Sequence, residues 1–466
     1  MLSEDILYSS VRELSKLLRT RKISPVELTE SYLSRLERLG EQLGAVVTIT
    51  RELALAEARR AEQEIIRGRY RGPLHGIPYG AKDLLATKDI PTSWGAEPYR
   101  NQVFDQDATV IKRLREAGAI LIAKLAMVEL AGGMGYNNAD ASFTGPGRTP
   151  WNREYWSGGS SAGSGAAVAA ALVGFAIGSE TSGSILTPSA FCGVSGLRPT
   201  YGLVSRHGAM ALCWTLDKLG PMCRSADDCG LVLAAIAGED ENDPSSVAKR
   251  FSYADKRRPR RFKLGIIKGS SENIQPEVRA NYEAALQKLG EFADLVPDVE
   301  LPDFPYGGIV GIIVAAEGGS AFLDLIESGK LNQLRVPADR AGGYSMMLVP
   351  AVDYLQAMRL RNAMKKPFDE LLSRYDALVA PTRGTVAYPI GVNFDKAYPG
   401  VRSGTALIPA GNAVGVPAIS VPNGFGAQGL PTAIQFMGRT FSETTLLEIA
   451  NAYQRATDWH RRRPPV

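Results

Sequence analysis

The chain has 466 residues, of which 45% are hydrophobic and 22% are charged, and its net charge is +4. This composition is typical of a globular protein and excludes a disordered or fibrous one. The charge is a small excess of 53 Lys and Arg over 49 Asp and Glu, whereas nucleic-acid binding usually requires a concentrated basic face. We therefore expect no nucleic-acid partner.

The N-terminal segment mixes both charges and lacks a continuous apolar stretch, so no secretory signal is predicted. No window reaches the roughly 18 consecutive apolar residues of a membrane span. The best candidate, 166–178, is short, and its alanines and glycines suit close helix packing. We expect a cytoplasmic protein that does not contact a membrane.

The cysteines and histidines predict no metal centre. Cys192, Cys213, Cys223 and Cys229 form no C-x-x-C pair, and the chain has only three histidines. A zinc site would have to be assembled from distant pieces of the chain. We predict buried free thiols, no bound metal and no cofactor.

Two helices open the chain. Ser10 and Ser24 each stand three residues before a glutamate, which is the capping-box pattern of a helix N-terminus, and Pro25 suits the first helical position. The next predicted elements are a helix at 51–66, a strand and turn at 76–86, a helix that stops at Gly118 and a strand within 108–127, and a small-residue helix near 163–174.

The rest of the chain alternates strands and helices. The predicted elements are strands at 261–269, 375–382, 417–425 and 430–438 and a helix at 442–456 with Ser442 as its cap. The basic run 256–261 is predicted to be a solvated linker. Alternating strands and helices favour a layered α/β fold.

The stretch SGGSSAGSG, residues 157–165, has four serines, four glycines and no charge. A hydrolase elbow at 159–163 would need a strand before it and a suitable late histidine, and the segment before it is a poor strand. A phosphate-binding loop would need Lys after its last glycine, but Ala-Ala-Val follows Gly165. The S-x-x-K match at 246–249 lacks the S-D-N and K-T-G elements of its class.

A fourth arrangement uses a lysine as the base. Ser184 follows Ser160 by 24 residues inside GSETSGSILTPSAFCGVSGLRPT, residues 178–200, and Lys82 lies upstream in PLHGIPYGAKDLL. This set resembles the amidase signature family, which combines a glycine/serine loop, a second G-S segment and a P-x-x-F-C-G-V-x-G-L-[KR]-P-T run. The resemblance covers nearly the whole chain and includes the LDKLGPM turn at 216–222.

The resemblance implies an α/β fold with a large mixed central β-sheet flanked by helices on both faces. It implies one amidase domain over 1–466, with a catalytic core at 60–250 and a variable substrate-pocket region at 270–420. It makes Ser184 the nucleophile, Lys82 the base, and Ser160, after a cis peptide bond, the proton relay. The oxyanion hole is expected from the backbone N–H groups of Thr181, Ser182, Gly183 and Ser184.

Lysine chemistry adds a condition. A free lysine has a pKa of about 10.4 and is charged at neutral pH, so Lys82 can act as a base only if burial lowers its pKa by several units. A carboxylate beside the amine would oppose that change. We therefore predict that the side chain of Asp83 points away from Lys82.

Where many family members have D-T-G-G-S-I-R, residues 180–186 read E-T-S-G-S-I-L and so differ at three positions, of which 182 and 186 bear on the site. Ser182 replaces a glycine, which is expected to restrict the oxyanion turn. Leu186 replaces an arginine, which removes a cation near the acyl side and favours a neutral or apolar acyl group.

Two functions remain open. The first is a stand-alone amidase that hydrolyses a small-molecule amide and also accepts esters or carbamates, with a homodimer kept open. The second is the A subunit of a glutamyl-tRNA(Gln) amidotransferase, which releases ammonia from glutamine for a partner. Leu186 and the lack of a basic patch favour the first. A binding protein without catalysis is disfavoured by the intact Lys82, Ser160 and Ser184.

Overall fold

The computed structural model describes residues 1–254 and 260–466. Within these residues an 11-stranded sheet, with the order β1-β3-β2-β4-β6-β5-β10-β11-β9-β7-β8, forms the centre of the molecule. The strands are β1 (Val46–Ile49), β2 (Pro78–Lys82), β3 (Ile120–Leu125), β4 (Phe175–Glu180), β5 (Ser195–Arg198), β6 (Lys218–Cys223), β7 (Phe262–Ile267), β8 (Ala293–Val299), β9 (Ala377–Pro381), β10 (Ala418–Phe425) and β11 (Pro431–Met437). Parallel and antiparallel pairs occur side by side, so the predicted mixed α/β fold is confirmed.

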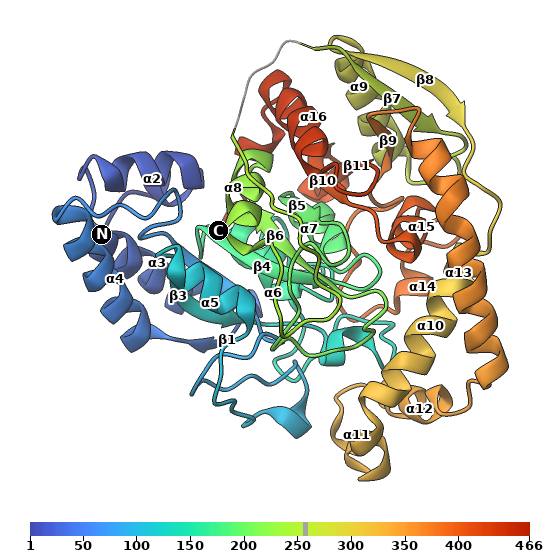
Figure 1. Ribbon diagram of the computed structural model, residues 1–466, viewed down its shortest axis with the longest axis horizontal. Helices are drawn as coiled ribbons and strands as arrows, with labels where there is room; N and C mark the ends of the chain where they lie inside the picture. Colours follow the sequence, from blue (N-terminus) through green and yellow to red (C-terminus); the bar gives the residue numbers. More distant parts are fainter. Residues whose placement is uncertain (255–259) are drawn as a thin grey trace.

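Helices surround this sheet (Figure 1). They are α1 (Glu4–Leu7), α2 (Val11–Arg19), α3 (Pro25–Leu39), α4 (Arg51–Ile66), α5 (Thr109–Glu116), α6 (Ala162–Ala169), α7 (Leu186–Cys192), α8 (Ala226–Ile236), α9 (Pro276–Gly290), α10 (Tyr306–Ala321), α11 (Leu323–Glu327), α12 (Pro337–Met346), α13 (Ala351–Leu372), α14 (Phe394–Ala397), α15 (Leu407–Val414) and α16 (Glu443–Ala456). In Figure 1 the N-terminal helices α2 and α4 lie on the left, and the long α13 runs along the right side.

The order of strands in the middle of the sheet brings distant segments together. Strand β2 lies between β3 and β4 and is parallel to both. Lys82 is the last residue of β2 and Glu180 is the last residue of β4. Because neighbouring parallel strands end at the same edge of a sheet, the lysine and the segment that follows β4 meet there. Open α/β sheets commonly bind ligands at this edge.

The predicted helix starts are confirmed. Ser10 and Ser24 each accept a hydrogen bond from the N–H of the glutamate three residues on, and each glutamate carboxylate accepts from the N–H of its serine. The predicted helix at 51–66 is α4, and the strand predicted within 76–86 is β2. Ser442 stands at the N-cap of α16, but its hydroxyl makes no cap bond and donates to the carbonyl of Arg439 instead.

Other sequence predictions need correction. Helix α6 ends at Ala169, short of the predicted 174, because the chain turns there and Ala171 has a φ of 50°. The LDKLGPM segment was predicted to be a turn, but strand β6 begins within it at Lys218. Of the predicted linker 256–261, residues 256–259 lie outside the described residues, and Arg260 and Arg261 pair with Asp376 and Asp294.

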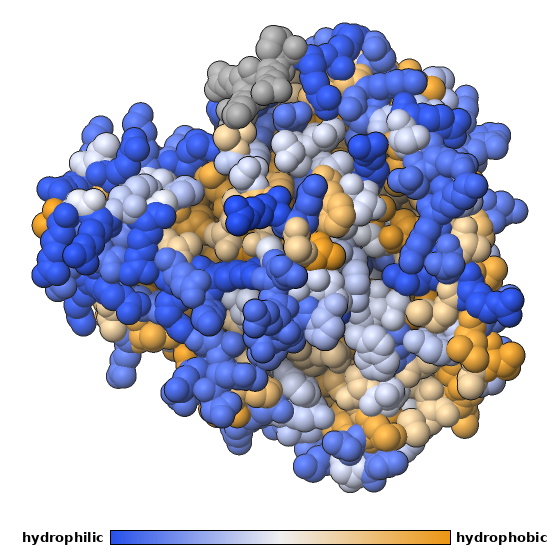
Figure 2. Space-filling view, in the orientation of Figure 1, coloured by the Kyte–Doolittle hydropathy of each residue, from blue (hydrophilic) through white to orange (hydrophobic). Residues whose placement is uncertain are grey.

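The displayed face is mostly polar, with apolar side chains in several places (Figure 2). Figure 2 shows apolar side chains gathered at the lower right, in the area of α10, α12 and α13. The exposed large apolar residues at the end of α12 and the start of α13 are Tyr344, Met347, Leu348, Val352 and Leu355. No helix in the described part of the chain is both long and apolar enough to cross a membrane. All four cysteines are buried with free thiols, as predicted.

Candidate active site

Lys82 ends β2 with its amine in the protein interior. The side chain is fully buried, and its Nζ donates hydrogen bonds to Ser160 Oγ at 2.7 Å and to Ser179 Oγ at 2.8 Å. Burial lowers the pKa of Lys82 to about 7, although the charges of Asp217 and Glu180 oppose this change. A substantial fraction of the amine is therefore neutral at pH 7, which is the state that a base requires.

Asp83 points away from Lys82, as predicted. Its carboxylate lies 3.1 Å from Lys124 Nζ, and both side chains are fully buried. The same carboxylate accepts hydrogen bonds from the N–H and the hydroxyl of Ser93. Lys124 therefore neutralises the negative charge of Asp83, and Lys82 has no directly bound carboxylate.

The serine loop passes between Lys82 and the second serine segment. The Gly159–Ser160 peptide bond is cis, as the resemblance implied. An added Cβ at Gly159 would lie only 2.7 Å from ring carbon Cζ2 of Trp156, so a side chain has no room there. The N–H of Ser161 donates to the carbonyl of Ser184 at 3.3 Å, which holds the loop against the turn that carries Ser184.

The turn from 181 to 185 connects β4 to α7 and carries Ser184. Gly183 has a φ of 99°, and a Cβ at this position would lie 3.2 Å from Ile408 of α15. Ser182 is exposed and has no positive φ, so serine does not strain the turn at this position. Among the loop and turn hydrogen bonds of the described chain, none is donated by the N–H groups of residues 182–184, so these groups are free to meet a ligand.

The buried side chain of Glu180 holds this turn in place through hydrogen bonds. The residue stands where the D-T-G-G-S-I-R pattern has Asp, and its Oε2 accepts from the N–H groups of Ile185 and Leu186 at 2.9 and 3.0 Å. Its Oε1 lies 3.1 Å from Nη1 of Arg198 and accepts from Nδ2 of Asn412 at 2.9 Å. Burial by itself would raise the pKa of Glu180, but Arg198, Asn412 and Leu186 N–H together lower it. The carboxylate therefore stays ionised and tethers the start of α7.

Replacing Arg198 with Met is expected to destabilise the fold, because it leaves the fully buried Glu180 carboxylate without its cation. Loss of one partner from a buried ion pair typically costs about 3–5 kcal/mol of unfolding free energy. Urea denaturation of the purified variant measures this loss, and the paired change Arg198→Met with Glu180→Gln should recover part of it. A variant as stable as the wild type would contradict this role for the ion pair.

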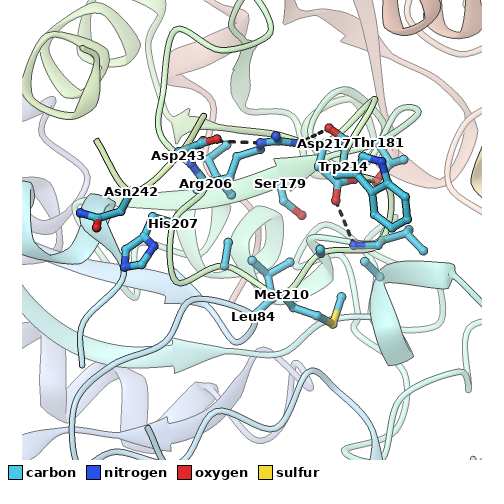
Figure 3. A pocket seen from close by; sticks show the side chains of 15 residues that line it. Leu84, Ser179, Thr181, Arg206, His207, Met210, Trp214, Asp217, Asn242 and Asp243 are labelled. Atoms are coloured by element: carbon cyan, nitrogen blue, oxygen red, sulfur yellow. Dashed lines mark hydrogen bonds and ion pairs between the residues drawn. The ribbon is translucent and has the colours of Figure 1, made fainter. Parts of the chain in front are cut away.

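A pocket opens beside the turn (Figure 3) and has an empty volume of about 650 Å³. Its 15 lining residues all lie between 84 and 243 and include Ser179 and Thr181. In Figure 3 His207 and Asn242 lie at one end, Trp214 lies at the other, and Ser179 lies between them. The apolar part of the lining consists of Leu84, Ala131, Ala209, Met210, Ala211, Leu212, Trp214 and Leu219.

The charged residues of this pocket are bound to the protein itself. Arg206 donates to Ser245 Oγ at 2.6 Å and to the carbonyl of Trp214, and its Nε lies 3.7 Å from Asp243. Asp217 accepts hydrogen bonds from Thr181 Oγ1 at 2.6 Å and from the N–H groups of Leu212 and Cys213 at 2.9 Å each. These contacts leave a pocket whose free surface is largely apolar.

The structure joins Lys82 and Ser160 directly, whereas the hydroxyl of Ser184 is not hydrogen-bonded to Ser160 among the described residues. Lys82 and Ser160 are hydrogen-bonded, and the Ser184 segment lies against the serine loop. Ser184 itself is 6% exposed, and the described residues show no hydrogen bond between its Oγ and Ser160 Oγ. In enzymes without bound substrate such contacts are often longer than in the working complex. Leu186 is fully buried in the hydrophobic core and does not line the pocket.

Sequence reasoning missed Ser179. Its hydroxyl accepts the second hydrogen bond of Lys82, and it lies on β4 directly before Glu180. The available signal was its place in the GSETSGS segment, but a serine inside a strand has no distinctive pattern. A hydroxyl that accepts from an amine favours the charged form of that amine.

Replacing Ser179 with Ala is therefore expected to have two effects. The pKa of Lys82 should fall below its value of about 7, and the rate should drop roughly 5-fold because the amine loses one of its two hydrogen-bond acceptors, a loss of about 1 kcal/mol. The measurement is the pH dependence of amide turnover for the variant and the wild type. An acid limb at the same pH in both proteins would show that Ser179 does not act on the lysine.

Comparisons with known proteins identify the family of the chain. The family model for Amidase matches residues 27–447. The A subunit of the glutamyl-tRNA(Gln) amidotransferase of Moorella thermoacetica is 37% identical, with 99% of each chain covered. The solved structure of a peptide amidase from Stenotrophomonas maltophilia is 31% identical with a TM-score of 0.87 and 98% of each chain covered. That of the corresponding A subunit from Thermotoga maritima is 28% identical, with a TM-score of 0.81 and 98% of this chain and 97% of that chain covered. With its lysine and two serine segments arranged as described, the chain belongs to the amidase signature family.

Proposed function

We propose that the protein is an amidase that hydrolyses a carboxamide-type C–N bond through an acyl-enzyme on Ser184. The observation that carries this proposal is the 2.7 Å hydrogen bond from the buried Lys82 Nζ to Ser160 Oγ, next to the Ser184 turn. An amide has a poor leaving group, so its hydrolysis needs an activated nucleophile, a proton for the nitrogen and donors for the oxyanion.

The residues supply each of these requirements in turn. Neutral Lys82 takes a proton from Ser160 Oγ, Ser160 takes one from Ser184 Oγ, and Ser184 Oγ forms a bond to the carbonyl carbon. The negative charge on the carbonyl oxygen is stabilised by N–H groups of residues 181–184. The proton returns through Ser160 to the amine nitrogen as the C–N bond breaks. Water then attacks the ester by the same route, which releases the acid and restores Ser184.

The substrate group that fills the pocket of residues 84–243 is proposed to be neutral or apolar. This inference is supported by the apolar lining and by the commitment of Arg206 and Asp217 to contacts inside the protein. An apolar pocket gains affinity from buried apolar area and has no charge to offer a ligand. Esters and carbamates present the same carbonyl carbon with a better leaving group, so the same site would hydrolyse them as well.

A second candidate is an amidotransferase A subunit that releases ammonia from glutamine. The observation that favours it is the 37% identity to the Moorella thermoacetica protein over 99% of both chains. In that case the protein would work with further subunits. In the first case it needs none, binds no nucleic acid and functions as a monomer or a homodimer.

One experiment separates the two candidates. The purified chain is assayed alone against a panel of anilides, primary amides, carbamates and glutamine, with its elution volume recorded on the same sample. Turnover of neutral amides without any partner is the result we expect. Turnover of glutamine only after companion proteins are added would establish the second candidate instead.

We also propose that 1–466 forms a single amidase domain with its catalytic core at 60–250. Lys82, Ser160, Ser184 and all 15 lining residues of the pocket fall within that range. The 270–420 region is proposed to shape the substrate pocket by supporting the segments that line it. Two contacts support this role: Glu317 of α10 accepts from the N–H of Thr215 at 3.0 Å, and Ile408 of α15 lies behind Gly183.

A further inference from the structure

An aromatic cluster packs against the serine loop that carries Ser160. The ring of Trp156 stacks on Phe394 with centroids 4.4 Å apart, and Tyr388 stacks on Phe394 at 4.8 Å. Phe191 of α7 meets the edge of Tyr388 at 5.5 Å. The cluster touches the catalytic segment directly, because the ring of Trp156 packs against Gly159.

Arg383 places a cation in this cluster. Its Nη2 donates to the hydroxyl of Tyr388 at 2.9 Å, and its guanidinium carbon lies 6.0 Å from the ring centre of Phe191. In the described part of the chain no carboxylate lies within ion-pair distance of Arg383, unlike the fully paired Arg198 of the active site. Its Nε is buried and has no hydrogen-bond partner. A guanidinium has five N–H donors, and most of those on Arg383 are unused.

Other donors nearby also lack acceptors. Nε1 of Trp156 and the hydroxyls of Ser157 and Thr385 are buried without a hydrogen-bond partner. Each of these groups carries a hydrogen that can be donated, and buried polar groups in native proteins are almost always paired. A cluster with several unused donors and one cation is complementary to a ligand that carries negative charge and accepts hydrogen bonds.

The cluster is also close to the turn that carries Ser184. Burial raises the pKa of Tyr136 to about 12, with Arg383 lowering it and Tyr388 and Glu180 raising it. The Tyr136 hydroxyl therefore lies within electrostatic range of both the Arg383 guanidinium and the Glu180 carboxylate, which fixes the Ser184 turn. Its ring meets that of Trp156 at 5.8 Å. The cluster also contacts both catalytic segments by packing: Trp156 lies against Gly159 of the serine loop, and Phe191 belongs to α7, the helix that follows the Ser184 turn.

We propose that Arg383 and this cluster form a subsite for a carboxylate carried by the substrate, at a distance from the amide that is cleaved. The inference rests on the proposed amidase function and specifies its substrate class further. The substrate then has an amide, a neutral part in the pocket of residues 84–243 and an anionic end at Arg383. A planar guanidinium binds a carboxylate through two parallel hydrogen bonds. Arg383 thus provides the cation that position 186, a buried leucine, lacks.

The first test compares matched amides in which a methyl group replaces the carboxylate. One pair is 4-carbamoylbenzoate and 4-methylbenzamide, and a shorter pair is succinamate and butyramide. For the pair that fits better, the wild type should show a higher kcat/KM with the anionic member. Arg383→Gln should lower the ratio of the two kcat/KM values by roughly 50-fold, the effect of losing a hydrogen bond to a charged group. Arg383→Lys should recover part of that loss.

The control variant is Arg402→Gln, which removes an exposed arginine whose guanidinium contacts only the carbonyl of Gly269 among the described residues. It should leave the ratio of the two kcat/KM values as in the wild type, which excludes a general effect of net charge. A wild-type ratio near 1 for both pairs, or the same ratio in Arg383→Gln, would overturn the proposal and indicate that the unused donors bind water.

The second test separates the subsite from the catalytic proposal. Calorimetric titration of the Ser184→Ala protein with 4-carbamoylbenzoate and with 4-methylbenzamide measures binding without turnover. Tighter binding of the anion, lost in the double variant with Arg383→Gln, supports the subsite even if no amide is hydrolysed by the wild type. Hydrolysis of neutral amides by the wild type with no preference for the anion in either test leaves the amidase in place and removes the subsite.

Discussion

Replacement of Ser184 with Ala is expected to reduce amide turnover by about 10⁴-fold or more, the size of effect seen when a serine nucleophile is removed. The methyl group of alanine cannot form the acyl bond. The fold should be retained, because Ser184 contributes only a backbone carbonyl to the hydrogen bonds of the described chain. Turnover is measured with a chromogenic anilide, and the acyl-enzyme is detected by intact-protein mass spectrometry.

The matched control is Ser320→Ala, which removes an exposed hydroxyl on α10. It should retain the wild-type rate and show the same acyl-enzyme mass during turnover. Ser160→Ala is expected to be severely impaired but to keep some activity, because water can carry a proton across the space that the hydroxyl leaves. A Ser184→Ala protein with a rate near that of the wild type would refute the nucleophile assignment.

The change with the second-largest expected effect is Lys82→Ala. It removes the buried amine that donates to Ser160 and Ser179, so the relay from Ser184 through Ser160 has no base to accept its proton. We expect a loss of roughly 10³–10⁴-fold in kcat, with a smaller change in KM, because general-base catalysis acts on the chemical step. The measurement is steady-state kinetics of the purified variant with the same anilide.

A rescue experiment and a control variant distinguish a chemical role of Lys82 from a structural one. Addition of a small primary amine to Lys82→Ala should restore part of the activity, since the space left by the side chain can hold a soluble base. Lys88→Ala removes an exposed lysine on the loop after β2 and should behave as the wild type. Equal loss of activity in Lys88→Ala, or a fully active Lys82→Ala, would contradict the role of the base.

The segments that carry the chemistry were predictable because their residues are unusual for structure. A loop of only serine, glycine and alanine cannot build a core, and a lysine inside an apolar segment is costly to bury. These features drew attention to the segments, and the resemblance to the amidase signature family then assigned roles to Lys82, Ser160 and Ser184. The capping boxes at Ser10 and Ser24 were predictable for a similar reason, since they depend on contacts three residues apart.

Features set by contacts between distant residues were not predictable. Strands β4 and β6 contain glycines and polar residues that favour turns, and each is held as a strand by pairing on both sides in the middle of the sheet. The acceptor role of Ser179 depends on the parallel pairing of β2 and β4. Leu186 was expected near the acyl group, but α7 directs it into the core. Arg383 and Trp156 are linked through Tyr388, and this arrangement depends on loops more than 200 residues apart.

The most direct test of the catalytic account is the pH dependence of kcat/KM for a neutral amide between pH 5 and 10. The active form is the neutral amine, and the pKa of Lys82 is about 7. We predict a constant rate above pH 8 and a fall that approaches tenfold per pH unit below pH 6, because protonated Lys82 cannot accept a hydrogen from Ser160. A rate that stays constant down to pH 5, or one that rises only near pH 10 as for an exposed lysine, would contradict it.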